Sequence, residues 1–148
     1  MFVIFNSLDF LALLFGSVIM DIEPFLVLGF HLPYPLHGPI HSVIGALMIA
    51  PLAYFAVLAT RFFISLFKSS TKPKKSPKTV LISILIGEYS HLILDAFLYP
   101  EMNLAWPLHG GNPLLNIISL DWIYIICILC FFAGILILVL KKFFRRKV

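Results

Sequence analysis

The stretch IGEYSHLILDAFLYP, residues 86–100, places three ionisable side chains inside an otherwise apolar segment. On a helix, Glu88, His91 and Asp95 occupy positions i, i+3 and i+7, so they share one stripe about 60° wide. A charged side chain near the middle of a membrane helix costs about 2.5–3.5 kcal/mol. The stripe must therefore face a bundle interior or a polar cavity, where it forms either a functional site or a hydrogen-bonded network without chemistry.

The rest of the chain has the composition of an integral membrane protein. Of its 148 residues, 61% are hydrophobic and only 12% are charged. A soluble domain usually carries about 25% charged residues, and no water-soluble fold of this size could bury so much apolar side chain. We therefore expect a multi-pass, all-α protein of the cell membrane, built as a single domain of residues 1–148.

Four segments are long and apolar enough to cross a bilayer, which requires about 20 residues per helix. They are residues 2–20, 43–67, 79–99 and 120–140. Polar residues near the start of the first segment, ending with Asp9, are typical helix caps and would shorten its apolar part. Proline and glycine in segments 21–42 and 100–119 predict irregular loops, although residues 24–32 could re-enter the membrane. The expected fold class is a four-helix transmembrane bundle.

The distribution of lysine and arginine predicts the orientation. Of eleven such residues, five lie in segment 68–78 and five in the tail 141–148. Cationic segments stay in the cytoplasm, so the N-terminus, this loop and the C-terminus are all predicted to be cytoplasmic. Both basic segments are expected to contact anionic lipid headgroups rather than nucleic acid. All five histidines and six of the seven acids then lie in the outer loops or the adjoining helix ends.

The outer loops supply further residue types that bind metals. The motif MDIEP (residues 20–24) carries two carboxylates, and LHGPIHS (residues 36–42) carries two histidines on either side of a proline that favours a helix start. Taken alone, the two acids could simply end a helix at the interface. Imidazole nitrogen and carboxylate oxygen without thiolate suit Zn²⁺, Mn²⁺ or Fe²⁺. We predict a site for one or two divalent ions, zinc by preference, with the ligands Asp21, Glu23, His37, His41, His91 and Asp95.

Cys127 and Cys130 form the only C-x-x-C motif in the chain. Such a motif can be redox-active or half of a zinc site. Inside an apolar helix without other polar groups, however, we expect both thiols to behave as small hydrophobic side chains.

In their order along the chain, these motifs resemble those of a known family. The stretches MDIEP, HGPIHS and GEYSHLILDAFLYPEMNLAWP are similar to P-D-I-D-H-P, H-R-G-x-T-H-S and G-x-x-S-H-x-x-x-D-x-x-T-P-x-G-x-x-x-x-W-P of the membrane-bound metal-dependent hydrolases, the YdjM-like group of inner-membrane proteins. The resemblance covers residues 16–107 and implies a metal-dependent hydrolase whose motif positions are the six predicted ligands. The chain departs from the family pattern at Met20, Glu23, Gly38-Pro39 and Glu88.

A fainter similarity links the chain to zinc-dependent phospholipase C and the related single-strand nucleases. Those enzymes use H-x-x-x-D followed by a proline and another histidine. The corresponding residues here would be His91, Asp95, Pro107 and His109.

A metal-dependent hydrolase embedded in the membrane is thus the leading functional hypothesis. A bound metal would lower the pKa of a water molecule toward about 7, Glu88 or Glu23 would act as general base, and His109 as an acid. A site at headgroup depth predicts a phosphodiester or phospholipid-like substrate. The alternatives are a divalent-metal binding or transport protein without enzymatic activity, and a structural cluster whose basic loop 68–78 docks a partner.

The tetrapeptide PLHG occurs twice, at residues 35–38 and 107–110. Each copy lies in an outer loop and follows an acid at the outer end of a predicted helix. The hairpins 2–67 and 79–140 run in the same direction through the membrane. This pattern would fit a duplication that produced two parallel hairpin repeats.

Overall fold

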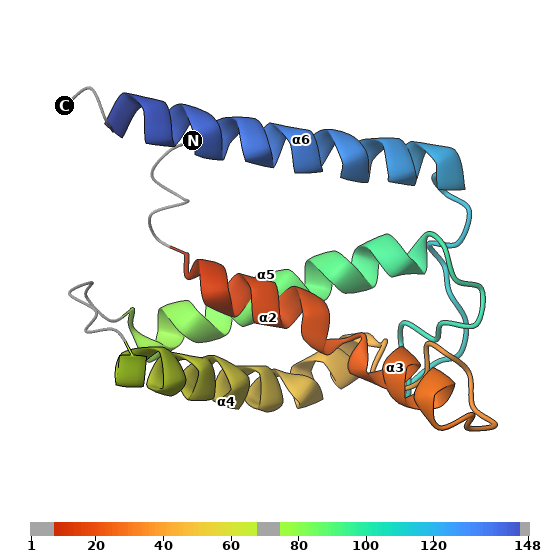
Figure 1. Ribbon diagram of the computed structural model, residues 1–148. Coiled ribbons are helices and arrows are strands. Elements are labelled where there is room, and N and C mark those ends of the chain that lie inside the picture. Colours follow the sequence, from red (N-terminus) through yellow and green to blue (C-terminus); the bar gives the residue numbers. More distant parts are fainter. Residues whose placement is uncertain (1–7, 68–74, 146–148) are drawn as a thin grey trace.

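The computed structural model describes residues 8–67 and 75–145 (Figure 1). These residues form five α-helices and no strand. In chain order the helices are α2 (Phe10–Ile19), α3 (Ile22–Gly29), α4 (Val43–Phe67), α5 (Pro77–Ala96) and α6 (Leu120–Arg145). Three of them are long and apolar enough to cross a membrane, and α2 together with α3 could form a fourth span. These lengths and compositions are those of an all-α membrane protein, as the sequence predicts.

The N-terminal part of the chain differs most from the sequence-based expectation. Helix α2 begins at Phe10 because Asp9 caps it, accepting a hydrogen bond from the nitrogen of Ala12 at 3.0 Å. After a break at Met20–Asp21 the chain forms α3, at an angle of 40° to α2. The expectation that this region is irregular is therefore wrong for α3. Pro24 is compatible with the helix because it lies in the first turn, where its missing N–H has no partner to lose.

The remaining helices follow the predicted segments closely. Helix α4 has the predicted bounds, and α6 begins at the predicted residue and continues to Arg145. Helix α5 begins two residues earlier than expected, at Pro77, because the Ser76 hydroxyl accepts a hydrogen bond from the nitrogen of Thr79 at 3.2 Å. It ends at Ala96, three residues before the predicted end at residue 99. Residues 2–7 of the first predicted span, 68–74 of the basic loop and the end of the basic tail lie outside the described residues.

Helices α2, α4 and α5 pack together, and the closest approach is between α2 and α5. A Cβ atom added at Gly16 would lie 2.2 Å from the carbonyl oxygen of Ile84, and one at Gly87 would lie 2.4 Å from that of Leu13. Small residues allow transmembrane helices to bring their backbones into contact in this way. The buried core beside this contact consists of Ala12, Ala50, Ala53, Val57, Val80 and Ile84.

Helix α6 stands apart from the packed helices α2, α4 and α5 (Figure 1). Only 6% of its apolar window is buried, compared with 33% in α4 and 39% in α5. The described helices therefore form a bundle of three, with α6 beside it, rather than the expected bundle of four. Cys127 and Cys130 are exposed on α6 and form no disulfide. Because α6 does not pack on α5 as α4 packs on α2, the two predicted hairpins are not equivalent in the structure.

Each end of the three-helix bundle is held by polar side chains. At the end where α2 begins, Asp9 forms an ion pair with Arg61 of α4, and its backbone nitrogen donates to the Ser83 hydroxyl of α5 at 2.9 Å. These two contacts fix α2 against both of its neighbours. At the opposite end, where α2 stops, lie the histidines and carboxylates that the sequence singles out.

Gly16→Ala is expected to lower the free energy of unfolding by about 1–3 kcal/mol, because the added methyl group would meet backbone atoms of α5. Gly134→Ala on α6 is the matched control, since apart from the adjoining backbone of α6 no described atom lies within 4 Å of its new Cβ. The control should leave stability unchanged or raise it by up to about 1 kcal/mol. Unfolding in mixed detergent, followed by circular dichroism, measures both. Equal stability of the two variants would contradict the close approach of α2 and α5.

Candidate metal centre

Five predicted metal ligands converge at the end of the bundle opposite Asp9. They come from the break between α2 and α3, the loop before α4, and the last two turns of α5. They form two overlapping groups, in each of which the ligand atoms lie within 4.8 Å of one another. One group is Asp21, His41 and His91, and the other is His37, His41 and Asp95. Residues distant in sequence thus share one small volume.

The carboxylate of Asp95 lies at the centre of this cluster. Its Oδ2 atom is 2.9 Å from Nε2 of His91. The Nε2 atoms of His41 and His37 lie 3.7 and 3.9 Å from the same oxygen. The same Nε2 atom of His91 is also 3.5 Å from Oδ1 of Asp21. Ligand atoms around a tetrahedral zinc ion, with bonds of 2.0–2.1 Å, stand about 3.3 Å apart, so these separations suit one shared ion.

Two further carboxylates contact the Nδ1 atoms of His37 and His41. Oε2 of Glu23 lies 2.9 Å from Nδ1 of His41, and Oε1 of Glu101 lies 2.9 Å from Nδ1 of His37. An ionised carboxylate only accepts hydrogen bonds, so both Nδ1 atoms carry the proton and the Nε2 atoms are directed toward Asp95. Histidines that bind metals usually donate their other ring nitrogen to a carboxylate in this way.

The unsatisfied atoms of the cluster also suit a metal. Nε2 of His41 is buried and has no hydrogen-bond partner among the described residues. Nε2 of His91 is also buried, and its close neighbours are the carboxylate oxygens of Asp95 at 2.9 Å and Asp21 at 3.5 Å. A buried polar atom without a partner is unfavourable in an apolar bundle. A cation between these nitrogens would supply the missing partner. The residues present therefore fit a divalent metal ion.

Glu23, the sixth predicted ligand, positions His41 instead of joining either group of ligand atoms. Besides His41, its carboxylate accepts hydrogen bonds from the backbone nitrogens of Gly38 at 3.0 Å and Ile40 at 3.4 Å. A Cβ atom at residue 38 would lie 2.6 Å from Oε1 of Glu23, so the glycine leaves room for the carboxylate. Glu23 thereby fixes the loop that carries both histidines.

The cluster is enclosed on one side and open on another. His41 is fully buried, and the ring of Tyr99 stacks on His37 with 3.8 Å between the ring centroids. The side chain of Asp21, by contrast, is 57% exposed. Structural metal sites are closed, whereas catalytic sites keep a position accessible to water or substrate. The exposed side at Asp21 gives this cluster such an access.

Glu101 is the functional residue that the sequence motifs did not identify. Its contact with His37 joins positions 64 residues apart, so no local spacing could predict it. The only indication was its place among the acids of the outer loops. Burial would raise the pKa of Glu101, but the hydrogen bond to His37 lowers it below the ordinary value. Glu101 is therefore available as the ionised acceptor that His37 requires.

The structure places the two predicted catalytic residues outside the ligand groups. Glu88 is fully buried in α5, one turn from His91, and neither carboxylate oxygen has a hydrogen-bond partner among the described residues. His109 is exposed, and no ion pair within the described ranges includes its side chain. The two PLHG copies thus differ, since His37 is buried in the cluster.

Comparisons of the chain with protein-family models, curated proteins and solved structures found no match. The similarity to the membrane-bound metal-dependent hydrolases therefore rests on the sequence motifs.

Purified protein is expected to contain near-stoichiometric zinc or manganese, and His91→Ala is expected to lose it, since this ring contacts both Asp21 and Asp95. His109→Ala is the matched control and should retain the metal. Elemental mass spectrometry of the detergent-purified variants measures the content. Parent protein that stays metal-free after reloading, or equal metal in both variants, would refute the proposed centre.

Glu88→Leu is expected to raise the free energy of unfolding by about 1–3 kcal/mol, because it removes a buried carboxyl group without partners. Glu23→Leu is expected to lower the free energy of unfolding, since that carboxylate accepts hydrogen bonds from three donors. Detergent unfolding of the two variants compares them directly. Destabilisation by Glu88→Leu as large as that by Glu23→Leu would show that Glu88 is held by the bundle.

Proposed function

We propose that this protein is a membrane-embedded, metal-dependent hydrolase that acts on a phosphodiester or phospholipid-like amphiphile at the membrane interface. The observation that carries the proposal is the convergence of three histidine Nε2 atoms on the Asp95 carboxylate. The carboxylates of Glu101 and Glu23 support it, because they bind the Nδ1 atoms of His37 and His41 and so leave the Nε2 atoms directed toward Asp95.

The donor atoms favour zinc, with manganese or iron as alternatives, because the cluster offers nitrogen and oxygen but no thiolate. The residues that would hold one or two ions are Asp21, His37, His41, His91 and Asp95. When bound, such an ion lowers the pKa of water toward about 7 and so makes hydroxide available at neutral pH. The two aspartates balance the charge of the ion.

The chain's own residues then divide the remaining tasks. Asp21 lies on the exposed side, where a substrate group could approach. Glu88 is the proposed general base, because its carboxyl group has no partner among the described residues and lies on the same stripe of α5 as His91. His109 is exposed and belongs to neither ligand group, so we assign it no step.

The surface around the opening suits a lipid-like substrate. Phe25, Leu28 and Phe30, which follow Asp21 in α3 and at its end, are 71%, 63% and 68% exposed. With the basic segments in the cytoplasm, α3 and the cluster would lie at the outer interface of the cell membrane. An amphiphile could then reach the site laterally from the bilayer, with its chains against α3.

A divalent-metal binding or transport protein is the alternative. A transport route would need polar groups that continue from the cluster toward Asp9 and Ser83, and buried Glu88 lies between them. However, the backbone contacts at Gly16 and Gly87 bring α2 and α5 together below the cluster. This close packing favours a site with a single opening.

Zinc-loaded protein in detergent or vesicles is expected to cleave a phospholipid or a fluorogenic phosphodiester in a broad substrate screen. His91→Ala should lose both metal and activity. Glu88→Gln should retain the metal and lose about 10²–10⁴-fold in rate, the usual contribution of a general base. Thin-layer chromatography or fluorescence follows the products. Absence of cleavage by protein shown to contain metal would refute the hydrolase and leave the metal-binding alternative.

A further inference from the structure

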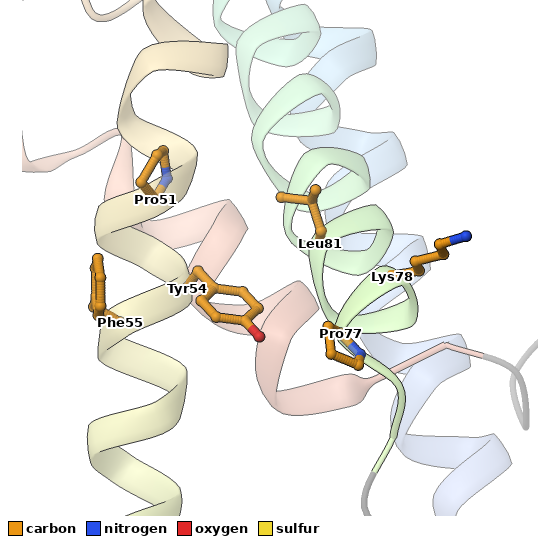
Figure 2. A pocket seen from close by; sticks show the side chains of 6 residues that line it. All are labelled: Pro51, Tyr54, Phe55, Pro77, Lys78 and Leu81. Atoms are coloured by element: carbon orange, nitrogen blue, oxygen red, sulfur yellow. The ribbon is translucent and has the colours of Figure 1, made fainter.

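A second candidate site lies between α4 and α5, away from the metal centre and near the start of α5. It is a groove of about 370 Å³, a volume typical of small-molecule sites. Figure 2 shows the six side chains that line it, three from each helix. They are Pro51, Tyr54, Phe55, Pro77, Lys78 and Leu81.

The walls of the groove are apolar and accessible from outside the protein. Phe55 is 67% exposed and Leu81 is 43% exposed. Both lie on helices that are long and apolar enough to cross a membrane, so in a bilayer this surface faces lipid. A hydrocarbon chain is therefore the natural occupant of the apolar part.

Two polar groups mark one end of the groove. The hydroxyl of Tyr54 points across it toward Pro77, the first residue of α5 (Figure 2), and no hydrogen bond of this hydroxyl to another described residue is present. The side chain of Lys78 lines the edge of the groove and extends from α5 away from Tyr54 (Figure 2), as lysine does when its stem lies on apolar surface and its ammonium reaches the headgroup layer. The groove thus has a hydroxyl between its two helices and a cationic side chain at its edge, where a lipid headgroup would lie.

The sequence that leads into α5 at this end is basic. Segment 68–78 carries five lysines and no acid. Lys78 lies in the first turn of the 20-residue helix α5, whose N-terminus adds a partial positive charge. Juxtamembrane lysines of this kind attract anionic lipids. The charge therefore distinguishes an anionic from a zwitterionic headgroup.

We propose that this groove binds an anionic phospholipid, with one acyl chain against Pro51, Phe55 and Leu81 and the phosphate at Lys78. The site is separate from the metal centre. Its occupant is a lipid of the cytoplasmic leaflet, whereas the substrate of the proposed hydrolase would approach from the outer leaflet.

Native mass spectrometry of the full-length protein in detergent tests this proposal. The protein is titrated with phosphatidylglycerol and phosphatidylcholine that carry identical acyl chains. Phosphatidylglycerol is expected to bind at least about fivefold more tightly, and Lys78→Gln should remove about that factor while leaving phosphatidylcholine unchanged. Leu81→Trp, which fills the groove, should weaken both lipids.

Two matched variants separate the groove from general effects. Lys142→Gln removes the same charge from the other basic segment, and Ile82→Trp adds the same bulk to an exposed position of α5 that does not line the groove. Both should bind lipid like the parent. Equal losses in the two lysine variants would show diffuse attraction only. Equal binding by the two tryptophan variants would show that no acyl chain occupies the groove, and either result overturns the proposal.

Discussion

The carboxylate of Glu23 is the interaction on which the arrangement of the metal centre depends. A buried carboxylate is unfavourable in an apolar bundle unless donors satisfy it, and here the imidazole of His41 and two backbone nitrogens do so. One side chain thereby joins the start of α3 to the loop before α4. It also determines which ring nitrogen of His41 faces Asp95. The position of α2 relative to α5 is set separately, by the close contact at Gly16 and Gly87.

At His41 the geometry favours a neutral ring beside a metal ion over a protonated ring. If His41 were protonated on both nitrogens, Nε2 would require an acceptor, yet the nearest carboxylate oxygen, on Asp95, is 3.7 Å away. That distance is too long for a hydrogen bond, and Nε2 has no other partner among the described residues. A neutral ring, with its lone pair toward the centre, fits this position better. A neutral His41 does not compensate the charge of the surrounding carboxylates, and a divalent ion would reduce that negative charge.

Much of this architecture could be predicted from the sequence, because hydrophobic length and helical spacing are local properties. The bounds of α4 and the shared stripe of His91 and Asp95 follow from them. The roles of Glu23 and Glu101 do not, since only the tertiary fold decides which nitrogen of a histidine a distant carboxylate reaches. The separation of α6 from the three-helix bundle could not be predicted from the sequence either. An apolar helix surface suits lipid as well as another helix, so composition cannot distinguish the two environments.

The environment of Glu88 favours a functional interpretation of the cluster over a purely structural one. A cluster that serves only to hold helices together would be expected to pair every buried polar group, as Glu23 and Glu101 pair theirs. Glu88 is fully buried on the same stripe as His91 and Asp95, yet both of its oxygens lack partners among the described residues. A leucine would suit that position better. A buried acid without partners, one helical turn from the candidate metal centre, supports the proposed role of Glu88 in proton transfer.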